Sequence, residues 1–160
     1  TDFVDAFSLT NDKNFRLIIC GNGEGKNYIL KKAEFDNRIV YKGFINRNDV
    51  LKLQKEVTFL VNPRKPKESI TLYSFPSKTM EYLFSGTPMM GYQLKGIPED
   101  YYEHFFNLDD SKLPLPDLIT KLLYTPKEIL NIKGQKAKEF ICNYKTSKHQ
   151  VSKIIEFINK

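Results

Sequence analysis

Lys78 and Glu81 lie about one helical turn apart in residues 74–81, the stretch of this sequence best suited to chemistry. A lysine in the first turn of a helix opposes the helix macrodipole, and this conflict disappears when an anion is bound there. The carboxylate of Glu81 can accept hydrogen bonds from a ribose diol. An ion pair between the two side chains is the alternative that needs no ligand. The stretch therefore predicts an anion site or, failing that, a surface ion pair.

The helix that carries these residues is predicted over 76–85 by its end signals. Pro76 suits the first turn, a serine at 74 or 77 can cap it, and Gly86 followed by Pro88 ends it. A helix that starts after the carboxyl end of a parallel strand presents unpaired N–H groups and accepts phosphate. The predicted ligand class is thus a phosphate-bearing molecule.

Three other segments qualify as ligand loops. Residues 62–69 form a long basic loop after a strand, in which Arg64 or Lys67 could clamp a pyrophosphate or could simply be solvated. Residues 21–26 are rich in glycine, but their spacing matches no nucleotide-binding fingerprint, which favours a tight turn. Gly43 would let the backbone approach a flat ligand closely, or would only end a strand.

Alternating short apolar runs and helical patterns predict the elements that position these residues. The strands show little polar alternation, as expected for strands buried on both faces of a parallel sheet. We expect a Rossmann-like, doubly wound α/β fold, followed by a helical C-terminus. Strands are expected at residues 16–20, 38–41, 57–61, 88–92 and 104–107, and helices at residues 2–8, 24–33, 48–55, 76–85, 113–123, 126–143 and 147–158.

Composition sets further bounds. The 160 residues, 41% apolar, suit one domain covering 1–160. No run is long and apolar enough to span a membrane, and no export signal begins the chain, so a cytoplasmic protein is expected.

The two cysteines follow apolar runs and are expected to fill space in a reducing compartment. The two histidines and two cysteines show no metal-ligand spacing, so no metal site is predicted. Residues 126–160 contribute +5 of the net charge of +6.

Four segments in order resemble the C-terminal, donor-binding domain of retaining glycosyltransferases of the GT-B class, the family 4-like group 1 transferases. These are residues 17–23, 40–45, 62–64 and 75–88. The resemblance implies the C-terminal half of a GT-B fold that binds a UDP- or GDP-sugar and needs no cofactor or metal. It implies these donor contacts: backbone amides near Ser77 and Lys78 at the diphosphate, Glu81 at the ribose, and Gly43, Phe44 and Ile45 at the base. Arg64, from the basic loop, is the further candidate for donor binding.

Two departures from the family pattern are present. Many relatives carry a further glutamate eight positions before the one that matches Glu81, and here that position is Tyr73. Glu68, Tyr73 and Ser74 are therefore the candidates for contacts with the donor sugar. The family's acceptor domain, first strand and first loop would precede residue 1. The resemblance thus implies a hexosyltransferase as the full-length protein, an inactive fragment in this chain, and catalytic residues that cannot be assigned.

The resemblance also implies a bacterial enzyme of polysaccharide, O-antigen or glycolipid assembly, because the family acts in these pathways. A glycan or lipid-linked acceptor and peripheral contact with the inner membrane surface follow as expectations, and the lysine-rich C-terminus is compatible with both. A nucleotide-sugar epimerase is one alternative, although no acid–base pair is evident. A basic nucleic-acid-binding module is the other, but the sequence has no RNP-like aromatic strand or helix-turn-helix pattern, so no nucleic-acid partner is expected.

Overall fold

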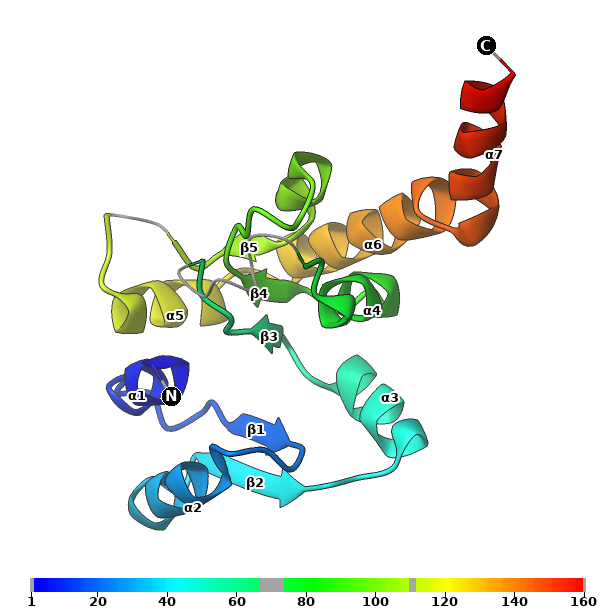
Figure 1. The fold of residues 1–160 in the computed structure, drawn as a ribbon. Helices are drawn as coiled ribbons and strands as arrows, with labels where there is room; N and C mark the ends of the chain where they lie inside the picture. Colours follow the sequence, from blue (N-terminus) through cyan, green and yellow to red (C-terminus); the bar gives the residue numbers. More distant parts are fainter. Residues whose placement is uncertain (1, 67–73, 110–111, 160) are drawn as a thin grey trace. The chain divides into compact units, whose positions relative to one another are not determined.

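The structure is a computed structural model that describes residues 2–66, 74–109 and 112–159, without the side chain of Lys153. The chain divides into two compact units. Unit 1 comprises Thr1–Glu56 and Leu108–Thr125, and unit 2 comprises Val57–Asn107 and Pro126–Lys160. Each unit contains its own parallel sheet, and each is described by itself (Figure 1).

Unit 1 is built on a two-stranded parallel sheet. Strands β1 (Leu17–Cys20) and β2 (Ile39–Gly43) pair in parallel, joined by helix α2 (Lys26–Phe35). A parallel pair needs such a crossover because its strands run the same way. The other helices of the unit are α1 (Asp2–Ser8), α3 (Arg47–Glu56) and α5 (Leu115–Leu123).

Arg38 ties the strands of unit 1 to the end of α1. Its guanidinium donates to the carbonyl oxygens of Ser8 (3.1 Å) and Asp12 (3.0 Å), so it satisfies one carbonyl at the end of α1 and one in the loop that follows. Asp36 accepts from the same guanidinium at 2.8 Å, and this hydrogen bond holds the pKa of Asp36 below its usual range. Helix α1 also contacts α5, and both helices bury apolar side chains, so this unit has a small core of its own.

Unit 2 is built on a three-stranded parallel sheet in the order β3-β4-β5. Its strands are β3 (Leu60–Asn62), β4 (Met89–Gly91) and β5 (Phe106–Asn107). Helix α4 (Ser77–Ser85) connects β3 to β4, and the 3-10 helix η2 (Glu99–His104) leads into β5. Helices α6 (Lys127–Tyr144) and α7 (Ser147–Ile158) complete the unit.

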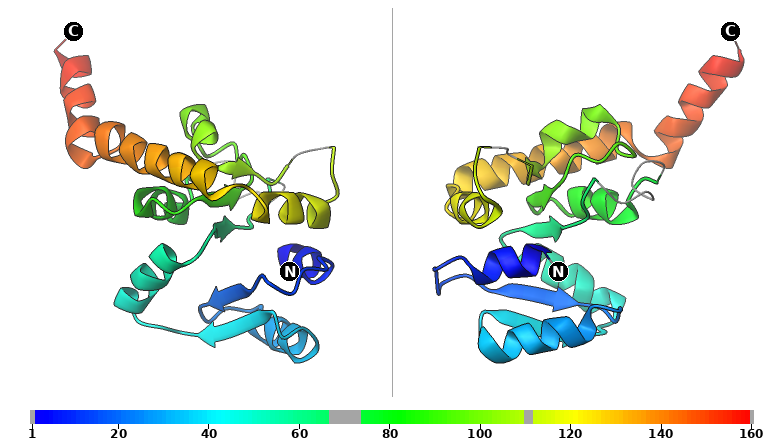
Figure 2. Two further views of the ribbon diagram at one scale, coloured as in Figure 1. Left: turned by 180° about the vertical axis from the view of Figure 1, so that it is seen from behind. Right: turned by 60° about the vertical axis from the view of Figure 1, so that its left-hand side comes forward.

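The core of unit 2 is dense around β4 and α4. Every residue of β4 is buried, and Leu83 of α4 has no exposed surface. Helices α4 and α6 lie side by side in both views of Figure 2. Gly134 of α6 is in contact with the end of α4, because a Cβ atom at this position would lie 2.0 Å from the Gly86 carbonyl oxygen. Only a glycine permits this approach.

The predicted α/β class with parallel strands is confirmed, and the predicted helices and strands are all present with boundaries close to those expected. The strands are distributed over two sheets, however, and η2 had no counterpart in the prediction. Burial on both faces holds for β4 but is wrong for β1, in which no residue is buried. The expectation that the cysteines fill buried space is also wrong, because Cys20 and Cys142 are both exposed.

Candidate functional site

The first turn of α4 is held against the carboxyl end of β3. Thr79 is fully buried, and its Oγ1 accepts a hydrogen bond from Nδ2 of Asn62 at 3.1 Å. The Thr79 N–H donates to the carbonyl of Pro76 at 2.9 Å, which closes the first turn. The start of the helix is therefore fixed at the edge of the sheet where α/β proteins bind their ligands.

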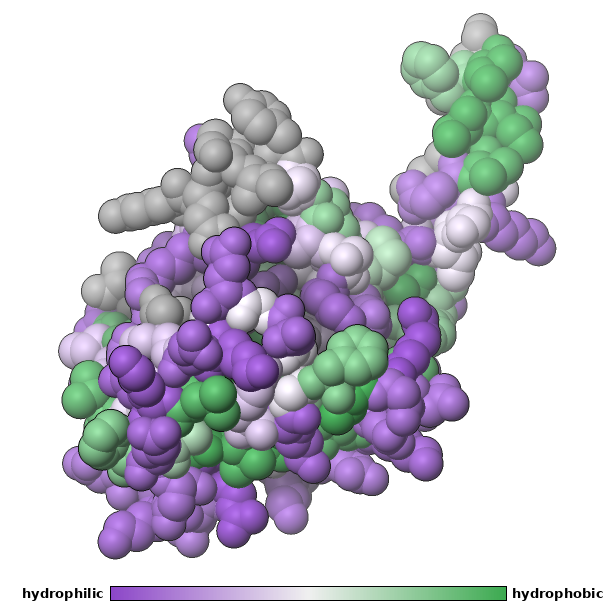
Figure 3. Space-filling model, turned by 60° about the horizontal axis from the view of Figure 1, so that its bottom comes forward, coloured by the Kyte–Doolittle hydropathy of each residue, from purple (hydrophilic) through white to green (hydrophobic). Residues whose placement is uncertain are grey.

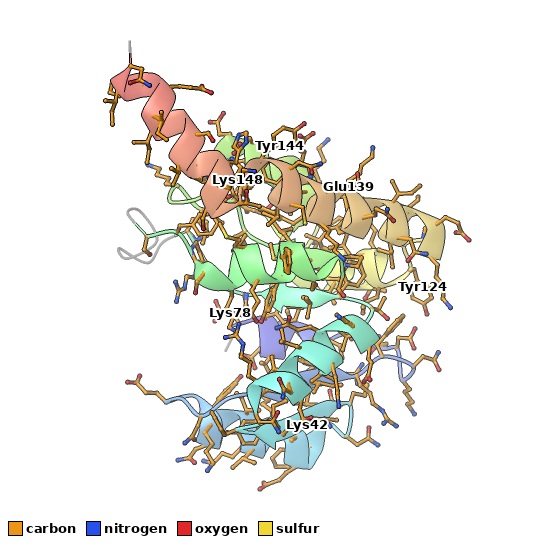
Figure 4. The ribbon with its side chains drawn as sticks, turned by 90° about the vertical axis from the view of Figure 1, so that its right-hand side faces the viewer. Lys42, Lys78, Tyr124, Glu139, Tyr144 and Lys148 are labelled. Carbon is orange, nitrogen blue, oxygen red and sulfur yellow. The ribbon has the colours of Figure 1, made fainter. Side chains whose placement is uncertain are left out.

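Lys78 and Glu81 form an ion pair on the outer side of this turn. Nζ of Lys78 lies 2.9 Å from Oε1 of Glu81. The lysine side chain is 55% exposed and the glutamate 29%, so the lysine can leave the pair at little cost. Figure 4 labels Lys78 where its side chain projects from α4. The alternative of a surface ion pair is thus observed, and the same geometry places a mobile cation and a carboxylate at a helix start.

The residue at the N-cap position of α4 is Pro76, with φ −70° and ψ 109°, and it makes no side-chain capping hydrogen bond. Ser77 does not cap the helix, because it is already inside it. The alternative cap at Ser74 stays a prediction. Ser77 and Lys78 thus contribute the first two helical N–H groups, which point out of the helix start.

The loop between β3 and α4 is described in part. Arg64 is exposed just beyond the end of β3, and Ser74 is half-buried before α4. Glu68 and Tyr73, two of the predicted donor-sugar contacts, and Lys67 lie outside the described residues. In unit 2 the structure therefore gathers Asn62, Arg64, Ser77, Lys78 and Glu81 around the β3–α4 connection.

The remaining predicted residues lie in unit 1, at the carboxyl end of β2. Gly43 has φ +63°, a conformation that favours glycine, and its carbonyl accepts from the Gly21 N–H at 2.7 Å. No atom lies within 4 Å of a Cβ placed on Gly43. Phe44 is 84% exposed, and Ile45 is half-buried. Unit 1 therefore presents an open glycine turn with an aromatic face beside it.

The glycine-rich segment after β1 is a tight turn, in accordance with the preferred interpretation. Gly21 has φ +127°, and the Lys26 N–H donates to the Gly23 carbonyl at 3.0 Å. Helix α2 then begins after Gly25 without a side-chain cap, and none of its residues is buried. This junction resembles the β3–α4 junction in connectivity, but its side-chain hydrogen bond, from Tyr41 Oη to the Gly21 carbonyl at 2.7 Å, holds the turn rather than a residue of the helix.

Two residues of the candidate site were missed from the sequence, Asn62 and Thr79. Asn62 was noticed only as part of the basic loop, and Thr79 only as part of the helix. A threonine at a position that faces inward on a helix, seventeen residues after an asparagine that ends a strand, is a weak signal. Neither residue type by itself indicates a side-chain hydrogen bond between positions so far apart in the sequence.

Among the described residues, no group of three or more His, Cys, Asp or Glu side chains is arranged to hold a metal ion. Two surface hollows lie away from the predicted residues, one in each unit. The hollow in unit 2 has a volume of about 700 Å³ and is lined mainly by α6. The chemistry available at the start of α4 is therefore electrostatic: helix N–H groups and a lysine for an anion, and a carboxylate for hydroxyl groups.

The sequence profile described as Glycosyl transferases group 1 matches residues 1–113 of the 160. The chain belongs to this glycosyltransferase family. The matched region includes β1 to β5, and thus both strand–helix junctions described above. No curated protein matches the sequence.

Membership of the family establishes glycosyl transfer as the general activity. It also establishes a sugar donor and an acceptor as the general partners. In the described part of the chain, none of the helices has the length and apolar character needed to cross a bilayer.

Proposed function

We propose that the first turn of α4 binds the diphosphate of a nucleotide sugar, as the donor-binding part of a retaining glycosyltransferase. The observation that carries this proposal is the Asn62–Thr79 hydrogen bond, which fixes the start of α4 at the carboxyl end of a parallel strand. A preorganised helix start stabilises the charge that develops on a leaving diphosphate, because its N–H groups need not reorganise during the reaction.

Lys78 and Glu81 have separate roles in this proposal. When the donor binds, the Lys78 ammonium leaves Glu81 for the diphosphate, where it forms charge-assisted hydrogen bonds. The Glu81 carboxylate then accepts hydrogen bonds from the 2′- and 3′-hydroxyls of the ribose. The exposure of Lys78 supports the exchange, since an exposed ion pair is weak and its side chain is free to rotate. Arg64 adds a second cation on the loop that leads to the helix.

The nucleotide base is assigned to Gly43, Phe44 and Ile45. The left-handed glycine turn leaves room for a planar ring, and the exposed face of Phe44 offers a stacking surface. A base ring on this surface covers apolar area that is otherwise exposed to water. The family match over residues 1–113 includes both groups of residues.

The reaction we propose is transfer of a hexose with retention of its anomeric configuration. The acceptor hydroxyl attacks the anomeric carbon on the face from which the diphosphate departs. The bond from this carbon to the donor oxygen breaks, and the acceptor proton passes to the leaving diphosphate. Neither a metal ion nor a cofactor is part of the proposal. The acceptor, a glycan or a lipid-linked sugar, binds to an N-terminal domain, so donor binding is the activity to measure on this chain.

A calorimetric titration with UDP- and GDP-linked hexoses tests the proposal. At least one of them should bind, and Lys78→Ala should weaken binding by about tenfold or more, the usual cost of a lost charged hydrogen bond. Lys127→Ala is the matched control, because Lys127 is also an exposed lysine in a first turn that follows a proline, at the start of α6. An equal loss of affinity in both variants would mean that Lys78 acts only through non-specific charge attraction, which would contradict the proposal.

Glu81→Ala provides an independent test of the ribose contact. It should weaken binding of the nucleoside diphosphate more than that of the 2′-deoxy and 3′-deoxy analogues, because each analogue already lacks one of the two partner hydroxyls. Lys78→Ala should weaken binding of all three. If Glu81→Ala affects the deoxy analogues as strongly as the parent nucleotide, the carboxylate does not bind the ribose.

A further inference from the structure

The hollow of unit 1 has a volume of about 1020 Å³ and lies at the amino end of β2. Its walls are α2 from Tyr28 onward, the loop from α2 to β2, and the loop that follows α1. Helix α2 lies beside β2 in Figures 1 and 2. Gly43, where we place the nucleotide base, lies five residues after Arg38, which is about 17 Å along an extended strand. The hollow is therefore separate from the donor site.

The groups that frame the hollow are held by ion pairs and hydrogen bonds. Nε of Arg38 donates to the Asp36 carboxylate at 2.9 Å, at the start of β2. Nζ of Lys32 lies 2.6 Å from the Asp5 carboxylate, and the Tyr28 hydroxyl donates to the same carboxylate. These contacts join α2 to α1 and fix the turn before β2. The hollow thus has its shape before any ligand binds.

Phe35, the last residue of α2, lines the hollow with an exposed ring. Its side chain is 89% exposed, and no residue of α2 is buried, so the ring makes no contribution to the core of unit 1. On the face of unit 1 seen in Figure 3, hydrophilic surface surrounds separate apolar patches. A single exposed phenylalanine is common in proteins, but here it offers a flat apolar surface inside a polar hollow.

Polar side chains that are free to bind a ligand share the hollow with this ring. Among the residues that the structure describes, five that line the hollow have side chains with no hydrogen bond or ion pair. The five are Asn11, Lys13, Lys31, Glu34 and Asn37. A side-chain amide both donates and accepts, an ammonium donates, and a carboxylate accepts. The hollow therefore offers both donors and acceptors around an aromatic ring.

This combination identifies the class of ligand. The free charges are two lysines and one glutamate, which nearly cancel. A nucleic acid requires many cations along its phosphates, so it does not suit the hollow. A carbohydrate does, because the C–H groups on one face of a sugar ring pack on an aromatic ring while its hydroxyls donate and accept. The volume, at the upper end of the roughly 300–1,000 Å³ of ligand pockets, suits more than one sugar unit.

We propose that this hollow binds a carbohydrate chain, with the Phe35 ring against one sugar and the free amides and charges around it at the hydroxyls. A glycan held there stays close to the enzyme between transfers, which raises its effective concentration. The inference goes beyond the proposed donor site and does not depend on it, because the two sites lie at opposite ends of β2.

An array of immobilised neutral and acidic oligosaccharides, followed by calorimetry with the strongest ligand, tests the proposal. At least one oligosaccharide should bind, and Phe35→Ala should weaken its binding by about tenfold or more, because the buried face of the ring is lost. Phe44→Ala is the matched control, since Phe44 is 84% exposed at the other end of β2, and it should retain the affinity for the oligosaccharide. Absence of binding across the array, or an equal loss in the two variants, would overturn the proposal.

A second pair of variants tests the polar contacts. Asn37→Ala should weaken oligosaccharide binding by about threefold to tenfold, the usual cost of a lost neutral hydrogen bond. Asn48→Ala removes another exposed amide of unit 1, on α3, and should leave binding unchanged. The affinity of the wild-type chain should fall little at high salt, which screens exposed charges. Thermal unfolding checks that all variants fold. A steep loss of affinity with salt, with equal binding by both asparagine variants, would show charge attraction alone, and the proposal would be wrong.

Discussion

The two strand–helix junctions of this chain have the same connectivity but are held in different ways. In unit 1, β1 leads through a glycine turn into α2, a helix with no buried residue. In unit 2, β3 leads into α4, whose start is bonded to the strand through Asn62 and Thr79 and whose end contacts Gly134 of α6. A glycine turn supplies backbone freedom, whereas a side-chain hydrogen bond to a buried residue of the helix supplies a fixed geometry. Electrostatic stabilisation of a leaving group requires the second.

Of the variants that test this difference between the junctions, Gly134→Ala is expected to lose the most stability. Alanine normally stabilises a helix interior relative to glycine, but here its Cβ would meet the Gly86 carbonyl oxygen at 2.0 Å. The free energy of unfolding should fall by about 1–3 kcal/mol, the usual cost of overpacking, as measured by urea denaturation.

Gly25→Ala is the matched control at the start of α2. Nothing lies within 4 Å of a Cβ placed there, and the φ of this residue is −74°. We expect a change within about 0.5 kcal/mol, as for other surface substitutions. If the two alanine variants lose similar stability, the junctions are equally packed and the contrast fails.

A smaller difference between the two units is expected in the way their stability depends on pH. Unit 2 contains both histidines, and His104 stacks on Phe140 with ring centroids 4.0 Å apart. Burial lowers the pKa of His104 below its ordinary value of 6.5. The unfolded chain therefore binds the proton more readily, so this contribution to stability is complete above about pH 6.5 and is lost as the pH falls toward the lowered pKa.

Hydrogen exchange at pH 7.5 and pH 5.5, corrected for the intrinsic rate, measures this pH effect separately for peptides of each unit. Protection in unit 2 should decrease at the lower pH more than protection in unit 1. His104→Phe, which keeps a ring against Phe140, should remove most of the difference. An unchanged pH response in this variant would assign the effect to other groups.

The sequence was sufficient to predict the helices and strands, because their ends are marked by residues such as Pro76 and Gly86 that act locally. It did not reveal the features that depend on contacts between residues far apart in the sequence. The Asn62–Thr79 hydrogen bond, the contact of Gly134 with Gly86 and the division into two sheets join positions far apart in the chain. Gly134 in particular looks in sequence like a mild helix defect, although the helix packing requires it.

Prediction of the candidate site from the sequence was limited in the same way. Lys78 and Glu81 were found by their spacing on one helix, a local property, and the structure shows them paired. A cap by Ser77 was predicted from residue type alone and was wrong, because Pro76 is the N-cap residue and Ser77 is the first residue of the helix. The assignments of Glu68 and Tyr73 remain predictions, since both lie outside the described residues.

The most direct test of the central claim is a titration of the isotope-labelled chain with inorganic diphosphate, followed by the backbone amide signals in NMR spectra. The account predicts saturable shifts that are largest for Ser77, Lys78 and Thr79, with small shifts for Gly23, Gly25 and Lys26 at the start of α2. Largest shifts at the glycine turn, or shifts spread evenly over the lysine-rich helices, would contradict it.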